Sequence, residues 1–70
     1  MTNAEAKILA RMRRLQAQGR RPELTAADAS HVIGCTEDDA RAALTELVRL
    51  KAVAPAVTRI SMPSVWRLVE

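Results

Sequence analysis

His31 and Cys35 are the residues whose types most often serve catalysis or metal binding, and they lie four positions apart. A zinc site needs further nitrogen or sulfur ligands, but the other candidate ligands near this pair are carboxylates. A catalytic cysteine–histidine pair needs a third, orienting group and a pocket, which a chain of 70 residues hardly provides. We therefore expect no metal site and no enzymatic activity, and we expect Cys35 to pack as a small apolar residue.

The sequence also lacks a motif that would bind a cofactor. The chain has only two glycines, so it contains no glycine-rich loop of the kind that surrounds phosphate groups. We expect no cofactor and no small-molecule substrate.

A second set of residues suits binding rather than reaction, and it lies in the stretch GCTEDDARAALTELVR at 34–49. On a helix of 100° per residue, an apolar stripe of Ala40, Ala43, Leu44, Leu47 and Leu50 defines the buried side. The residues on the opposite side are Asp38, Arg41, Ala42, Thr45 and Arg49. We expect this opposite side to face a ligand.

These side chains match the groups that proteins present to DNA. Arg41 could bind O6 and N7 of a guanine, Thr45 a thymine methyl or a phosphate, and Asp38 a cytosine amine. Arg49, near the helix end, is better suited to a phosphate. The alternative is a solvated helix face on which Arg41 pairs with Glu37 or Asp38.

Three acids open this helix, which is unexpected for a helix that meets a polyanion. Asp39 is explained by capping and Glu37 by the positive end of the helix dipole, and both lie on the flanks of the exposed side. The acids reduce non-specific attraction to phosphates. We therefore expect a single copy to bind DNA weakly, with an affinity that depends strongly on the DNA site.

The remaining basic residues lie mainly near the N-terminus. Arg11 and Arg14 belong to a row with Lys7 and Gln18, while Arg20 and Arg21 lie in a connector. They are candidates for backbone or partner contacts, and the alternative is a solvated edge. Arg59, in TRISMP, is a candidate for a minor groove.

Helix starts are marked three times by a threonine followed three positions later by an acid, at Thr2, Thr25 and Thr36. With the apolar spacing and the closing glycines, these starts predict helices over about 3–18, 26–33 and 37–50. In the first, Ile8, Leu9, Met12 and Leu15 form the apolar face.

After residue 51 the short, β-branched segments AVAPAV and SVWRLV predict a two-stranded hairpin over about 52–69. Pro55 restricts the first strand to a sheet edge, and Trp66 and Leu68 share the face that covers the helices. The prediction is one domain over 1–70, mainly α with a small β-hairpin.

This order of elements resembles the winged helix-turn-helix family. The resemblance is carried by LTAADASHVIGCTEDDARAALTELVRLKAV, in which Ala29 matches the small residue of the second helix, Gly34 the turn glycine and Thr36 the cap of the recognition helix. VWRL resembles the last strand of the wing. The chain departs from the family at Lys51, where a glycine is usual. The resemblance implies binding of double-stranded DNA, with the helix over 37–50 in the major groove and the wing on backbone or minor groove, often by a dimer.

Composition is compatible with this reading. Net charge is +3, with the positive excess in residues 1–22 and an acidic balance in residues 23–51. One cysteine, no apolar run that could span a membrane and no export signal predict a cytoplasmic protein. The core is thin, which makes a homodimer plausible.

Three functional hypotheses follow. The first is a bacterial or phage transcription regulator that binds DNA. The second is a protein-binding winged-helix module, such as a phage-encoded adaptor or inhibitor of a host complex, because opposite charges on two faces suit protein partners or head-to-tail self-association. The third is a fragment that has lost a partner domain.

Overall fold

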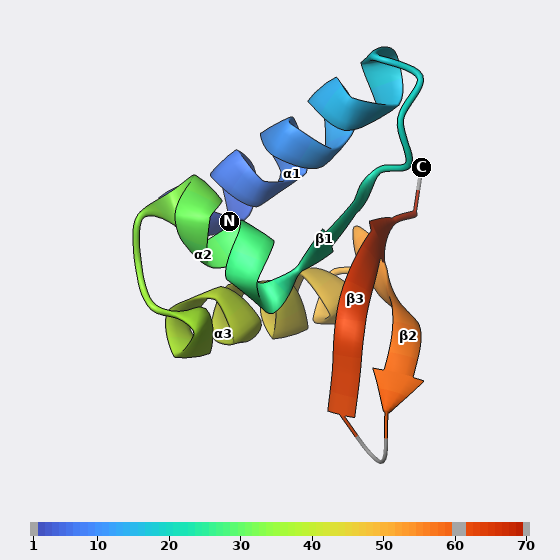
Figure 1. Ribbon diagram of the computed structural model, residues 1–70. Helices are drawn as coiled ribbons and strands as arrows, with labels where there is room; N and C mark the ends of the chain where they lie inside the picture. Colours follow the sequence, from blue (N-terminus) through green and yellow to red (C-terminus); the bar gives the residue numbers. More distant parts are fainter. Residues whose placement is uncertain (1, 60–61, 70) are drawn as a thin grey trace.

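The computed structural model describes residues 2–59 and 62–69, and it describes side chains for residues 2–56 and 64–69. The elements are α1 (Asn3–Ala17), β1 (Glu23–Thr25), α2 (Ala26–Ile33), α3 (Glu37–Arg49), β2 (Val53–Arg59) and β3 (Met62–Leu68). The helices lie to one side of a small antiparallel sheet, and the β2–β3 hairpin extends past α3 (Figure 1). The predicted α+β class is confirmed.

The helix starts follow from the three threonines. The Thr2 hydroxyl accepts from the Glu5 N–H, while the Glu5 carboxylate accepts from the Thr2 N–H at 3.1 Å. The same reciprocal pair joins Thr25 and Asp28. At α3, the Thr36 hydroxyl accepts from the Asp39 N–H at 3.2 Å, which is the first of the two predicted bonds.

The connector between α1 and α2 contains a strand that we did not predict. Glu23–Thr25 forms β1, which pairs antiparallel with β3 so that Leu24 lies opposite Trp66. The sheet therefore has three strands in the order β1-β3-β2, rather than the two of a simple hairpin. Because β2 lies at the edge, Pro55 removes no donor from a central strand, as predicted.

The core lies between the helices and the inner face of the sheet. Trp66 is 2% exposed and belongs to the same buried cluster as the apolar residues of α1 and α3. Leu50 was wrongly assigned to that face: α3 ends at Arg49, and Leu50 is 44% exposed at the C-cap.

Lys51 lies in the turn that leads from α3 into β2, where the resemblance to winged-helix proteins implies a glycine. Its φ is +62°, in the left-handed region that is sterically unfavourable for a residue with a Cβ. The chain therefore keeps the backbone turn that leads from α3 into β2, but forms it with a residue that is strained there.

Candidate nucleic-acid interface

The turn from α2 to α3 sets the direction of the candidate recognition helix. Gly34 ends α2 with φ +69°, and its N–H donates to the Ser30 carbonyl at 2.9 Å. Two residues later Thr36 caps α3, so the turn between the two helices is only three residues long, Gly34 to Thr36. Both features were predicted from the sequence, and Thr36 itself is exposed.

The outer side of α3 is open to solvent along most of its length. Asp38, Ala42, Thr45 and Arg49 are exposed, while Ala40, Ala43, Leu44 and Leu47 face the core. None of the four exposed side chains is covered by another element, so a ligand could contact them in this conformation. Arg41 differs from them, because it is only half-exposed.

Arg41 lies where α3 meets the hairpin. Its guanidinium carbon is 5.5 Å from the centre of the Trp66 ring, within the range of a cation–π interaction. The sequence suggested that Arg41 either faces a base or pairs with an acid of its own helix, and missed this contact with β3. Neighbouring positions on α3 gave no signal for it, because the contact depends on how β3 packs.

Arg49 has a partner on its own helix. Its Nε donates to Glu46 Oε1 and Oε2, each at 3.0 Å, and its Nη2 forms an ion pair with the same carboxylate. The hydrogen bond from Arg49 lowers the pKa of Glu46, and the same bond raises the pKa of Arg49. The i, i+3 spacing of the two residues was a signal for this pair that we did not use.

The pairing changes what Arg49 can do. Its positive charge is already balanced by Glu46 in the absence of a ligand, so a phosphate must compete with that carboxylate. The first turn of α3 is acidic for a separate reason, because it presents the exposed acids Glu37, Asp38 and Asp39.

Arg59, in the predicted wing, lies at the end of β2, and its side chain is outside the described part of the chain. Its predicted minor-groove contact therefore stays a prediction.

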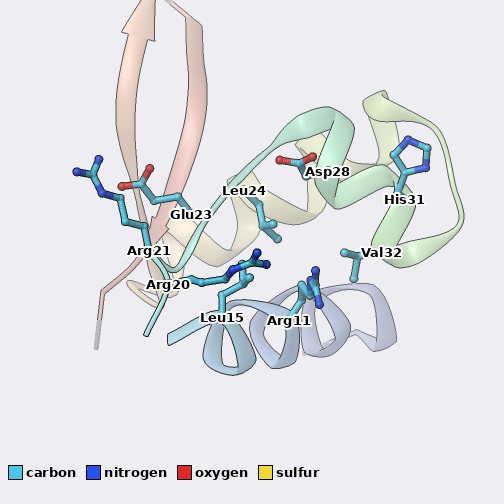
Figure 2. Close-up of a pocket in the computed structure, with 9 residues that line it drawn as sticks. All are labelled: Arg11, Leu15, Arg20, Arg21, Glu23, Leu24, Asp28, His31 and Val32. Carbon is cyan, nitrogen blue, oxygen red and sulfur yellow. The ribbon is translucent and has the colours of Figure 1, made fainter. Parts of the chain in front are cut away.

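The N-terminal arginines form a separate feature on another side of the molecule. Arg11, Arg20 and Arg21 line a groove between α1, β1 and α2, whereas Arg14 is exposed outside it. The other lining residues are Leu15, Glu23, Leu24, Asp28, His31 and Val32. Figure 2 shows Arg11 and Arg20 pointing into the groove from below, with His31 at its far end. The row of basic residues predicted along α1 is thus divided between two surfaces.

The residues first considered for chemistry are both at the surface. His31 and Cys35 are exposed, so the packing role expected for Cys35 is wrong. Its Sγ lies 3.6 Å from the Ile33 carbonyl oxygen, in the turn between α2 and α3. Among the residues that the structure describes, no three of His, Cys, Asp and Glu gather where they could hold a metal ion.

Within residues 2–59 and 62–69, none of the helices combines the length and the apolar character needed to cross a lipid bilayer. The chain matches no protein-family model, no curated protein and no solved structure. The residues and topology of the chain itself therefore carry the comparison with known folds, and three helices followed by a hairpin in a three-stranded antiparallel sheet are compatible with a winged-helix-like topology.

Proposed function

We propose that this chain is a winged helix-turn-helix protein that binds double-stranded DNA at specific sequences, as a small transcription regulator of bacterial or phage type. One observation carries the proposal: the outer side of α3 is uncovered and lies beside the hairpin, with the Arg41 guanidinium held at their junction. A major groove is wide enough to admit such a helix.

Each exposed residue has a role in this proposal. Arg41 turns from the Trp66 ring toward O6 and N7 of a guanine, and Thr45 contacts a thymine methyl or a phosphate. Asp38 accepts from a cytosine amine, and Ala42 allows the helix backbone to come close to the bases. Arg49 contacts a phosphate near the end of the helix.

The acids and the Glu46–Arg49 pair make non-specific attraction weak. Each neutralised phosphate contributes a slope of about −0.9 to the dependence of log K on log salt concentration. Because α3 has two arginines, one of them paired with Glu46, we expect a shallow slope for one copy, and a high specificity ratio rather than high affinity. Two copies on a two-fold site, together with Arg59 of the wing, would raise affinity.

The test is a selection from random duplexes at low salt, followed by fluorescence anisotropy of the enriched sequences. We expect one sequence family to be enriched, and Arg41→Gln to reduce affinity for it while Arg14→Gln leaves affinity unchanged. Arg14 is the matched control because it is an exposed arginine outside both α3 and the groove. The proposal fails if no duplex binds at low salt, including DNA from around the gene that encodes the chain.

A protein-binding winged-helix module, such as a phage-encoded adaptor or inhibitor of a host complex, is the second candidate. It is favoured by the separation of charge, since the opening of α3 is acidic while three arginines line the groove behind it. Charge reversal distinguishes the two candidates. If reversal at Arg41 and Arg49 leaves activity intact while reversal at the groove residues Arg11 and Arg20 abolishes it, the protein partner is the better account.

A further inference from the structure

The groove between α1, β1 and α2 has a volume of about 810 Å³ and an apolar floor that includes Leu15 and Leu24. None of its lining residues within the described part of the chain comes from α3 or from the β2–β3 hairpin. It is therefore a surface distinct from the proposed DNA contact.

The charges of this groove are unbalanced. Of its two carboxylates, Glu23 binds Arg67 at 2.8 Å, and Asp28 accepts from the Thr25 N–H in the cap of α2. By contrast, within residues 2–59 and 62–69 no hydrogen bond or ion pair engages the guanidinium of Arg11 or Arg20. Arg11 and Arg20 point into the groove (Figure 2), so they offer charge to an anionic ligand.

The same chain displays a matching anionic element elsewhere on its surface. Glu37, Asp38 and Asp39 occupy the first turn of α3, and all three are exposed. These carboxylates belong to one helical turn, so a single partner surface can meet several of them at once. Two surfaces of opposite charge on different sides of one molecule cannot meet within one copy, but they can meet between copies.

We propose that the groove binds the acidic first turn of α3 from a second copy of this chain, with Arg11 and Arg20 opposite Glu37 and Asp38. The contact is heterologous, so each copy in a chain of copies uses its groove for one neighbour and its α3 for the other. Exposed ion pairs are individually weak and are screened by salt, so the association is reversible and strongest at low ionic strength.

This contact covers the start of α3 and therefore excludes the proposed DNA contact on the same copy. It does not rest on DNA binding, because self-association is measured without any nucleic acid. Competition with DNA would be a consequence if both proposals hold.

Sedimentation velocity of the purified chain tests the proposal. In about 0.01 M salt, where the Debye length is about 30 Å, we expect the mean sedimentation coefficient to rise with protein concentration, and we expect this rise to disappear in about 1 M salt. R11E/R20E and E37K/D38K should each remain monomeric. Arg14→Glu, which reverses a charge on α1 outside the groove, should associate like the unmodified chain.

A charge exchange makes the test decisive. R11E/R20E has an acidic groove and an acidic α3, whereas E37K/D38K has a basic groove and a basic α3, so neither should associate alone. An equimolar mixture should associate again, because each groove then meets an α3 of opposite charge. Both variants keep Asp39, whose backbone N–H donates to the Thr36 hydroxyl at the start of α3. Circular dichroism checks that each variant is folded, and if R11E/R20E is not folded, the neutral R11Q/R20Q replaces it in the test for loss of association.

Several results would overturn the proposal. One is an unmodified chain that stays monomeric at about 0.01 M salt, and another is a mixture of exchanged variants that fails to associate although the unmodified chain does. Binding of a glutamate-rich peptide at Arg11 and Arg20 by a chain that does not self-associate would assign the groove to another protein. None of these results affects the DNA proposal, because DNA binding is tested separately by the duplex selection.

Discussion

The guanidinium of Arg41 lies over the indole of Trp66, with 5.5 Å between the guanidinium carbon and the ring centre. Trp66 is the only tryptophan of the chain and is almost fully buried in the core. Its ring therefore connects the core with Arg41 of α3. A side chain proposed to contact DNA therefore also contacts the sheet, through the Trp66 ring.

Removing the Arg41 cation should cost stability as well as binding. We expect Arg41→Ala to lower the free energy of unfolding by about 0.5–1 kcal/mol, the range of a partly exposed cation–π contact, and Arg41→Lys to retain part of it. Urea unfolding followed by Trp66 fluorescence measures this. Equal losses for Ala and Lys would show that the charge over the ring contributes nothing.

Discrimination between bases should depend on the same residue. For a duplex from the selection, Arg41→Gln should reduce affinity by about 1–3 kcal/mol and relax the preference at one guanine, as expected for loss of a two-bonded arginine–guanine contact. Anisotropy on duplexes changed at each position in turn measures it. If Arg41→Gln lost the same amount of affinity for every one of these duplexes, Arg41 would contact a phosphate instead of a base.

The Glu46–Arg49 pair should respond to acid and to DNA. Its hydrogen bond lowers the pKa of Glu46 in the folded chain, so the pair stabilises the fold at pH above the ordinary glutamate value of 4.5. That stabilisation is lost as pH falls through the lowered pKa. Carboxyl NMR should show Glu46 titrating below 4.5, and Arg49→Gln should bring it back toward 4.5. If Arg49 moves to a phosphate, DNA should raise the Glu46 pKa, and an unchanged value in the complex would contradict that contact.

Two capping acids should differ in their effect on stability because they differ in burial. Glu5 is 4% exposed and accepts from both the N–H and the hydroxyl of Thr2, whereas Asp28 performs the same role in an exposed cap. We expect Glu5→Ala to lower the free energy of unfolding by about 2 kcal/mol and Asp28→Ala by about 0.5–1 kcal/mol. Urea unfolding compares them, and equal losses would mean that burial of Glu5 has no consequence.

Relief of strain at Lys51 should stabilise the chain. At φ +62° a residue with a Cβ is disfavoured by about 1 kcal/mol, so Lys51→Gly should raise the free energy of unfolding by about that amount. Lys51→Ala is the control, since it removes the long side chain but keeps the Cβ, and should change stability little. A gain for alanine equal to that for glycine would locate the effect in the side chain instead.

The fold could be predicted from the sequence because its signals are local. Three threonine caps fix where the helices begin, Gly34 fixes where α2 ends, and the spacing of Ile8, Met12, Leu44 and Leu47 defines the buried faces. β1 was missed because three residues are too few to show a strand periodicity. Its formation depends on a partner strand some 40 residues later.

The candidate site could be predicted only in part. The wheel of α3 correctly placed Asp38, Ala42, Thr45 and Arg49 on the exposed side, because their positions follow from helix geometry, but it misplaced Leu50, which is exposed, and Arg41 is only half-exposed. The contact of Arg41 with Trp66 and the groove around Arg11 and Arg20 could not be predicted, because they join segments that only the tertiary packing brings together. The exposure of Cys35 depends likewise on the direction of one tight turn.

The most direct measurement is NMR mapping of amide shifts in the labelled chain as a selected duplex is added at low salt. The account predicts that the largest shifts fall on the outer side of α3, at Asp38, Ala42, Thr45 and Arg49, and on the indole N–H of Trp66. Shifts confined to Arg11, Arg20 and the groove, with α3 unaffected, would contradict it.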